Sequence, residues 1–517
     1  MKKLPLGVQD FKKIIEGNYL YVDKTAFIYQ LINSASYLFM SRPRRFGKSL
    51  LISILQELFR GHKALFAGLW IEDKLAWEAY PTIVIDFNTM SYKEKPLIDE
   101  LSKQLLLQAK EYEITLKEDN YKHQFTELIR SLSKKYKKRV VVLVDEYDKA
   151  LTDMLELPDR LDENRRTLKN FYSTIKSEDP YLHFVLLTGV SKFGKISIFS
   201  DLNNLLDLTL DQSLTCLFGY TQQELEHYFM PHLEQASKRL ATPLPDLLET
   251  IKYWYNGYSW DGKNTLYNPF SILSFFYHAR FSNYWFDTGT PTFLTKLLKE
   301  RKTPSYQLDN LLSDEMGVSY ADPERIDAIS LLFQTGYLTI KEADWRAAPP
   351  ALTLSYPNFE VKESFLKYLL AEYTNFRPNE ISTDILARIK KAILGQDWED
   401  FFDVLHAVFA SVPYQIFKTE EAYFHSLTHV VLKLTDMVVF SEVVTNRGRM
   451  DMVLSTPTHI YIFEFKTKGT AGEALAQIIQ QGYAERFATE GKEIALVGVV
   501  FDSENKGVKE WEIKMGK

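Results

Sequence analysis

The feature that most constrains the fold of this chain is a basic loop between a short apolar run and a helix-patterned segment. The apolar run covers 37–40, and residues 50–59 carry apolar side chains at helical spacing. The loop between them ends in Gly47-Lys48-Ser49, which matches the end of a Walker A loop in the required strand–loop–helix order. In such a loop the backbone N–H groups and the helix dipole favour an anion. The segment therefore predicts an α/β domain with a phosphate-binding loop.

The side chains of this loop predict particular contacts with a nucleotide. Lys48 would reach the β- and γ-phosphates, and the Ser49 hydroxyl would bind Mg²⁺. The first glycine of the pattern is replaced by Arg42, while Arg44 and Arg45 add cations near the phosphates. Taken alone, the loop also fits a basic turn before an ordinary helix.

A second acidic motif follows a buried strand. Residues 140–144 are apolar on both faces, as in a central parallel strand, and Asp145 and Glu146 come directly after them. This is a Walker B pattern, in which Asp145 would hold Mg²⁺ and Glu146 would polarise the attacking water as a general base. Thr188 ends the next apolar run and is a candidate γ-phosphate sensor. For Asp145 and Glu146 the alternative is a buried strand that runs into an ordinary polar loop. For Thr188 the alternative is a simple turn residue. The predicted nucleotide-binding residues are Arg42, Arg44, Arg45, Phe46, Gly47, Lys48, Ser49, Asp145 and Thr188.

The alternation of apolar runs and helical patterns predicts three domains. Residues 1–214 carry strand candidates separated by helices, which favours an α/β domain with a mostly parallel sheet. Residues 215–375 are mostly helical and end in a helix, two strands and a helix, which indicates a helical lid with a winged-helix-like module. The alternative is a helical lid with a hairpin that has no nucleic-acid role. After a linker at 373–379, residues 376–517 are predicted as a second α/β domain. The expected elements are strands at 37–40, 82–87, 140–144, 184–187, 336–340 and 352–356, helices at 96–113, 121–136, 326–333, 385–410 and 421–435, then three strands and a helix at 473–487.

An acid–acid–lysine pattern near the C-terminus predicts metal-assisted phosphodiester hydrolysis. Two of these strands, at 447–454 and 460–466, are joined by a short turn. Because side chains alternate along a strand, Glu464 and Lys466 share a face, and Asp451 falls at the same end of the hairpin. Asp451 and Glu464 would bind Mg²⁺, with Mn²⁺ as an alternative, and Lys466 would position the water or stabilise the transition state. The spacing also fits a surface hairpin with an ordinary Glu–Lys pair.

The helix at 473–487 follows this hairpin and carries several amide side chains. Gln477, Gln480 and Gln481 lie on adjoining faces, next to Tyr483. Their polar groups would contact the scissile phosphate or a nucleotide. An exposed polar helix face explains the same pattern.

Composition limits the remaining possibilities. The 517 residues are 45% hydrophobic and 25% charged, which excludes a disordered, collagen-like or disulfide-framework chain. A net charge of -6 excludes a global basic surface, so nucleic-acid binding needs a local patch. No apolar stretch approaches the roughly 20 residues that span a bilayer, and no secretory signal is evident. With Cys216 as the single cysteine, we expect a cytoplasmic protein without membrane contact.

These segments together resemble a bacterial and archaeal family that joins an N-terminal AAA-ATPase-like domain to a C-terminal PD-(D/E)XK nuclease domain. The resemblance covers most of the chain, and most weakly its middle. It is carried by motifs in the same order at 6–11, 21–25, 42–49, 145–148, 423–427, 446–451, 462–466 and 477–483.

The resemblance implies functions for particular residues. It implies ATP and Mg²⁺ binding at the set Lys48, Ser49, Asp145 and Glu146, and nuclease roles for the set Asp451, Glu464 and Lys466. Arg42 looks like the family's own version of the loop. The resemblance also implies a site role for Gln477, with Gln480 as the alternative match to the same motif position. Glu421 is a candidate for the acid that such nucleases carry early in a helix.

Three function hypotheses follow. The first is a nuclease whose site is gated by ATP binding or hydrolysis, with a defence role suggested by analogy. The second is an ATP-dependent scaffold whose nuclease-like domain only binds nucleic acid or a partner chain. The third is a winged-helix DNA-binding regulator, which the acidic character of 322–332 disfavours. DNA and RNA, endo- and exonuclease action, and monomer and oligomer all remain open.

Overall fold

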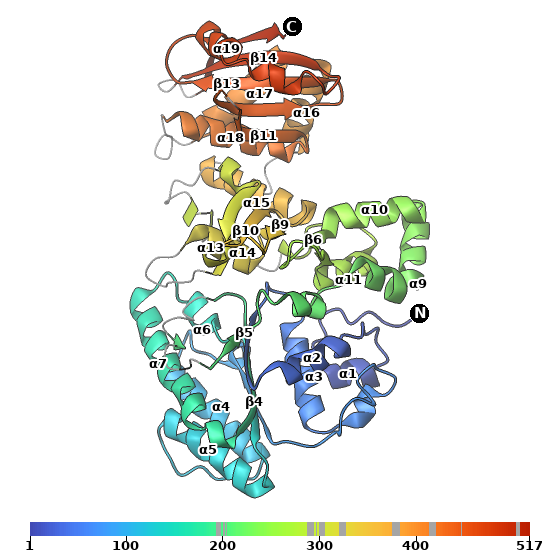
Figure 1. Ribbon diagram of the computed structural model, residues 1–517, viewed down its shortest axis with the longest axis vertical. Coiled ribbons are helices and arrows are strands. Elements are labelled where there is room, and N and C mark those ends of the chain that lie inside the picture. Colours follow the sequence, from blue (N-terminus) through green and yellow to red (C-terminus); the bar gives the residue numbers. More distant parts are fainter. Residues whose placement is uncertain are drawn as a thin grey trace. The chain divides into compact units, whose positions relative to one another are not determined.

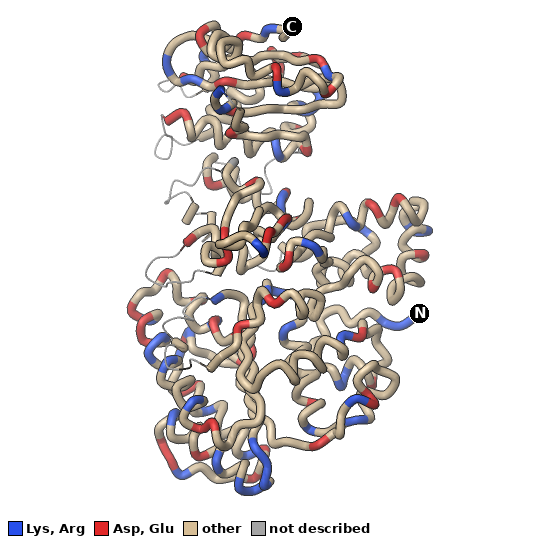
Figure 2. Tube along the Cα trace, viewed as in Figure 1, with Lys and Arg blue, Asp and Glu red and all other residues tan. Residues whose placement is uncertain are grey.

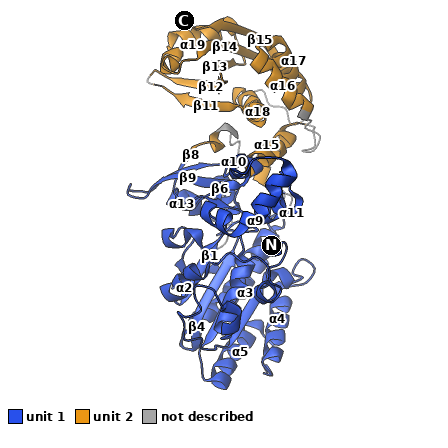
Figure 3. Cartoon of the chain, turned by 90° about the vertical axis from the view of Figure 1, so that its right-hand side faces the viewer, with its two compact units in different colours: residues 1–288, 312–360 blue, residues 289–311, 361–517 orange. Residues whose placement is uncertain are grey.

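The computed structural model places the chain in two compact units. It describes residues 1–192, 198–199, 202, 204–286, 294–295, 297–298, 305–319, 327–374, 383–412, 420–445, 447–502 and 507–516. Unit 1 comprises residues 1–288 and 312–360, and unit 2 comprises residues 289–311 and 361–517 (Figure 3). The division into three domains stays a prediction. Residues 375–379 of the predicted linker and 322–326 of the predicted acidic segment 322–332 lie outside the described residues.

Unit 1 is built around a five-stranded parallel sheet in the order β2-β3-β4-β1-β5. The four predicted strands of this region are confirmed, because each is an apolar run long enough to be buried on both faces. The phosphate loop follows β1, the acids follow β3, and β4 lies between these two strands. The strands are β1 (Tyr37–Ser41), β2 (Thr82–Asp86), β3 (Val140–Asp145), β4 (Leu182–Gly189) and β5 (Leu206–Asp207).

Helices cover both faces of this sheet (Figure 1). One layer contains α1 (Phe11–Glu16), α2 (Thr25–Ser34) and α3 (Lys48–Phe59), and the other contains α4 (Leu97–Glu111), α5 (Tyr121–Tyr136), α6 (Lys149–Thr152) and α7 (Pro158–Ser177). A continuous apolar core lies between the sheet and the second layer. Four short 3₁₀ turns complete the region: η1 (Lys63–Phe66), η2 (Phe87–Thr89), η3 (Asp179–Tyr181) and η4 (Gln212–Leu217). The predicted α/β architecture with a mostly parallel sheet is therefore confirmed.

The middle of the chain adds a helical part and a small sheet to unit 1. The helical part contains α9 (Gln222–Leu240), α10 (Leu244–Tyr255), the pair β6 (Asn256–Tyr258) and β7 (Leu266–Tyr267), and α11 (Pro269–His278). The second sheet has the order β8-β10-β9, from β8 (Leu311–Asp314), β9 (Thr339–Asp344) and β10 (Ala351–Ser355), beside α13 (Glu315–Ser319) and α14 (Ala328–Thr335). Six of the eight residues of α14 are buried, so this helix does not offer a surface for reading a DNA groove.

Unit 2 holds a five-stranded mixed sheet in the order β11-β12-β13-β14-β15. Only β13 and β14 run parallel, and the other neighbours are antiparallel. The strands are β11 (Val438–Val444), β12 (Arg449–Ser455), β13 (His459–Lys466), β14 (Glu493–Asp502) and β15 (Gly507–Met515). The helices are most of α15 (Phe359–Tyr373), α16 (Thr383–Gly395), α17 (Trp398–Ala410), α18 (Glu421–Leu434) and α19 (Ala471–Gln480), with 3₁₀ turns η6 (Ser305–Leu308) and η7 (Tyr483–Phe487).

The distribution of charge and of apolar helices agrees with the expectations drawn from the composition. Acidic and basic residues alternate along both units (Figure 2). Among the helices of the described ranges, none combines the length and the apolar character needed to cross a bilayer.

Candidate functional sites

The phosphate loop has the backbone that anion binding needs. Gly47 caps the N-terminus of α3 in the left-handed region, with φ of 97°, and Arg45 has φ of 67°. A glycine adopts this conformation without strain, which fits its place at the tightest turn of the loop. The twelve-residue helix α3 then begins at Lys48, so its free N–H groups face the end of β1.

Lys48 is poised inside this loop. Its ammonium group is buried and donates to the carbonyl oxygens of Arg42 (2.9 Å) and Pro43 (3.1 Å). Burial lowers the pKa of Lys48, while the negative charges of Glu146 and Asp145 act in the opposite direction. Among the described residues, the hydrogen bonds of this buried cation go to neutral carbonyls, and an anionic ligand would replace those contacts with charged ones.

Arg42 is turned away from the loop's interior. Its guanidinium is buried, donates to Ser41 O (2.9 Å) and Thr209 O (2.8 Å), and lies 4.2 Å from the centre of the Trp260 ring. Burial lowers the pKa of Arg42 to about 9. It does not line the pocket described below, unlike the other predicted loop residues. Arg42 therefore supports the loop from behind, at the position where the Walker A pattern has its first glycine.

The acidic strand end meets the candidate sensor. Asp145 is buried, and its Oδ1 accepts a hydrogen bond from Thr188 Oγ1 at 2.7 Å across the β3–β4 pair. Glu146 has φ of 54°, which is strained for a non-glycine residue and is a feature of functional sites. Burial raises the pKa of Glu146, and the charges of Lys48 and Lys149 oppose this rise. The Lys149 ammonium lies 3.6 Å from the Glu146 carboxylate.

Two further acids belong to this region, and neither was assigned a role from the sequence. Asp86 pairs in register with Asp145, and its Oδ1 accepts from Asn88 N (2.8 Å) and Asn88 Nδ2 (3.0 Å). Asp148 is buried and accepts from Ser191 N and Ser191 Oγ, both at 2.7 Å, which anchors the segment after β4. The available signal for Asp86 was its place at the end of an apolar strand, the same place that Asp145 occupies.

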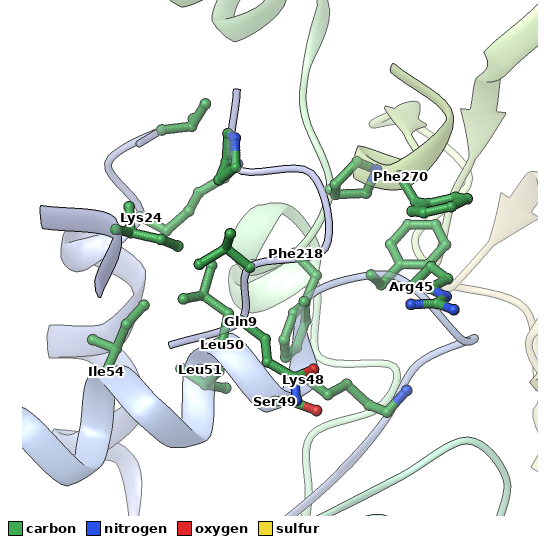
Figure 4. A pocket seen from close by; sticks show the side chains of 18 of the residues that line it. Gln9, Lys24, Arg45, Lys48, Ser49, Leu50, Leu51, Ile54, Phe218 and Phe270 are labelled. Atoms are coloured by element: carbon green, nitrogen blue, oxygen red, sulfur yellow. The ribbon is translucent and has the colours of Figure 1, made fainter. Parts of the chain in front are cut away.

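A pocket of about 560 Å³ opens in front of the loop. Figure 4 shows Lys48 and Ser49 between Ile54 and Lys24 on one side and Arg45 and Phe270 on the other. The Arg45 guanidinium lies 4.9 Å from the centre of the Phe270 ring. The polar part of the lining comes from the phosphate loop together with Gln9, Lys24, Asn88, Glu146 and Lys149. The apolar part comes from Pro5, Val8, Ile14, Leu20, Val22, Ile28, Leu51, Ile54, Leu217, Phe218, Pro269, Phe270 and Leu273. The pocket thus combines a charged part with an apolar part.

The second site lies in unit 2, where β12 and β13 bring two acids together. Met452 pairs with Phe463, so the next step of the antiparallel register places Asp451 opposite Glu464. Asp451 Oδ2 accepts from the backbone N of Phe465 at 2.7 Å. Burial raises the pKa of Asp451, and that hydrogen bond and the charge of Lys466 act against the rise.

Glu464 is the best-defined carboxylate of this site. Its Oε1 accepts from Lys466 Nζ (2.8 Å) and from Gln477 Nε2, while its Oε2 is buried and has no hydrogen-bond partner among the residues that the structure describes. Burial and the charge of Asp451 raise the pKa of Glu464 to about 7. A buried carboxylate oxygen without a donor is expensive unless a cation meets it, so the site fits a hard divalent metal.

The metal-ligand set is nevertheless incomplete in protein side chains. Across the described ranges, no group of three or more His, Cys, Asp or Glu side chains is arranged to hold a metal ion. Two acids with an open oxygen supply part of a coordination shell, which substrate oxygens and water would complete, as Mg²⁺ prefers.

The remaining candidates differ in position. Gln477 reaches Glu464 from α19, whereas Gln480 is exposed at the end of that helix. Glu421 begins α18, and its pKa is raised by burial and by the charge of Asp451, which places its carboxylate near the acids. His425 on α18 was not predicted as a site residue; burial and the charge of Arg449 lower its pKa to about 3, so it is neutral at physiological pH. His425 lies within the motif at 423–427 that carries part of the family resemblance, but the sequence analysis gave this histidine no role.

Comparison with known proteins agrees with this geometry. Residues 5–199 match the family model described as a predicted AAA-ATPase, and residues 419–511 match that of the PD-(D/E)XK nuclease superfamily. The chain is 37% identical to the "Uncharacterized protein in vnfD 5'region" of Azotobacter chroococcum mcd 1 over an alignment of 517 positions, which covers 98% of each chain. The chain therefore belongs to the same family as this protein, with an AAA-ATPase-like domain at the N-terminal end and a PD-(D/E)XK nuclease superfamily domain at the C-terminal end.

Proposed function

We propose that the chain is an ATPase fused to a metal-dependent nuclease, and that the nucleotide state of the first domain gates phosphodiester hydrolysis by the second. The observation that carries the nuclease half is the state of Glu464. One of its oxygens accepts hydrogen bonds from Lys466 and Gln477. The other is buried beside Asp451 and has no hydrogen-bond partner among the described residues. A structural hairpin would pair both oxygens or leave them in water.

ATP binding rests on the pocket. Its charged part offers Lys48 and the N–H groups of the loop to the phosphates, and Ser49 and Asp145 would hold Mg²⁺. The base would lie against its apolar part. Glu146 lines the same pocket and would take the proton of the attacking water, with Thr188 beside Asp145 to sense the γ-phosphate.

Nuclease chemistry rests on the unit 2 acids. Asp451 and Glu464 would hold Mg²⁺ or Mn²⁺, which would lower the pKa of a bound water and stabilise charge on the phosphate. Lys466 would stabilise the negative charge that develops as water attacks phosphorus and the leaving oxygen departs. Gln477 fixes the Glu464 carboxylate from α19.

Gating requires that the nucleotide favours one conformation over another. Contacts within unit 1 link the phosphate loop to the middle segment. Trp285 Nε1 donates to Arg44 O (3.1 Å), and a Cβ at Gly336 would lie 2.7 Å from Pro43 Cβ. The segment after Thr188 is linked as well, because Lys192 N donates to Gln334 at 2.6 Å. A shift of either segment on ATP binding would therefore act on the end of α14.

Lys48→Ala is expected to weaken ATP binding by about 2–5 kcal/mol, roughly 30- to 4,000-fold, because a buried charged partner of the phosphates is lost. Titration with a fluorescent ATP analogue measures the dissociation constant. Lys134→Ala, at an exposed position in the last turn of α5, is the matched control and should bind as the wild type does. Equal affinity in all three proteins would contradict the proposed nucleotide site.

The scaffold hypothesis predicts a different result for the same preparations. It requires ATP binding and nucleic-acid binding without cleavage under any metal condition. Loss of cleavage on Asp451 substitution, described below, separates the two functions.

A further inference from the structure

Arg449 stands beside the acids of the nuclease site. It begins β12 two residues before Asp451, so the two side chains share a face of the sheet. On the neighbouring strand Ser441 pairs with Met452 and Val443 with Met450, and the register passes over Glu442, whose φ of 57° takes it out of the regular strand alternation. Glu442 contacts β12 through its side chain, which forms an ion pair with Arg449.

The Arg449 side chain is oriented but accessible. Its Nε forms an ion pair with the Glu442 carboxylate, whose side chain is only 21% exposed, while 63% of the Arg449 side chain remains in contact with solvent. Its backbone is fixed as well, because the buried Tyr483 donates its hydroxyl to Arg449 O at 2.9 Å. An arginine whose Nε is held in an ion pair, and whose guanidinium is otherwise accessible to solvent, is preorganised to bind a second, planar, anionic partner.

The charge of Arg449 reaches the site. Burial lowers the pKa of His425, and the charge of Arg449 lowers it further. Burial raises the pKa of Asp451, and the charges of Lys466 and Arg449 oppose that rise. The two acids thus have a cation on each of two sides, Lys466 on β13 and Arg449 on β12.

We propose that Arg449 binds a backbone phosphate of the nucleic acid next to the scissile one and so positions the substrate strand over Asp451 and Glu464. This inference rests on the proposed nuclease function. The guanidinium fork matches two phosphate oxygens, and such contacts fix the register of a strand without reading its sequence. The opposing explanation is an ion pair that only joins β11 to β12.

The test measures binding of fluorescein-labelled duplex and single-stranded oligonucleotides by anisotropy, with Ca²⁺ in place of Mg²⁺ and over a series of KCl concentrations. Arg449→Ala is expected to weaken binding about tenfold and to lower the slope of log K against log [salt] by about 1. Arg447→Ala is the matched control, since Arg447 is also half-exposed and paired, but with Glu485 at 3.2 Å. It should keep the wild-type affinity and slope. Arg449→Gln gives the same readout if the alanine variant is unstable.

The outcomes separate the two proposals. Wild-type binding with an unchanged slope in Arg449→Ala would overturn the role of Arg449 and leave the nuclease proposal standing. Absence of binding to either oligonucleotide by the wild type would overturn both.

Discussion

Asp451→Asn is expected to reduce nucleic-acid cleavage by on the order of 10³-fold, because the metal ion of the proposed nuclease site, which would stabilise transition-state charge by several kcal/mol, would lose one of its two anionic ligands. The substitution keeps the fold, since the asparagine amide oxygen still accepts the hydrogen bond from Phe465 N. Initial rates on a labelled plasmid with Mg²⁺ or Mn²⁺ measure the effect.

The control for this experiment is Glu490→Gln, which removes a carboxylate from an exposed position of the same unit. Its cleavage rate should equal that of the wild type. Undiminished cleavage in Asp451→Asn would mean that the row of Asp451 and Glu464 is not the nuclease site.

Glu146→Gln is expected to lower ATP turnover by about 10²- to 10⁴-fold while ATP binding is retained. The glutamine has the same shape but does not accept the proton of the attacking water. Phosphate release measures turnover, and the binding titration used for Lys48→Ala measures affinity.

Lys48→Ala is the comparison here, because it should lose binding and turnover together. Glu156→Gln, in the exposed turn before α7, is the matched control for loss of a carboxylate. Turnover of Glu146→Gln at the wild-type rate would remove Glu146 from the role of general base.

The sequence predicted the nucleotide-binding sheet well because its strands are buried on both faces. An apolar run such as 140–144 is then a strong signal by itself. The two-residue strand β5 was not predicted, since such a short pairing has no periodicity. The sequence also did not predict where the Arg42 side chain lies. It depends on Thr209 and Trp260, which are distant along the chain and meet Arg42 only in the folded unit.

Helix ends in the C-terminal part were predicted less well. The pattern at 385–410 contains two helices, α16 and α17, separated where Gln396 has φ of 58° and Asp397 caps α17. The helix predicted at 473–487 ends at Gln480, and Gly482 in the left-handed region starts η7. The sheet has five strands where three were expected.

The two acids of the proposed nuclease site were predicted by strand alternation, which is a local rule. The choice between Gln477 and Gln480 required the rotation of α19 against β13, which only tertiary packing sets. For the same reason the sequence did not assign roles to Glu442 or His425, which approach the acids from β11 and α18.

The most direct test of the account is cleavage of a labelled nucleic acid by the full chain with Mg²⁺, with and without ATP, beside Lys48→Ala and Asp451→Ala. The account predicts that ATP changes the wild-type rate, that Lys48→Ala no longer responds to ATP, and that Asp451→Ala does not cleave in either condition. Wild-type cleavage at one rate with and without bound ATP would contradict gating, and absence of cleavage in every condition would contradict the nuclease itself.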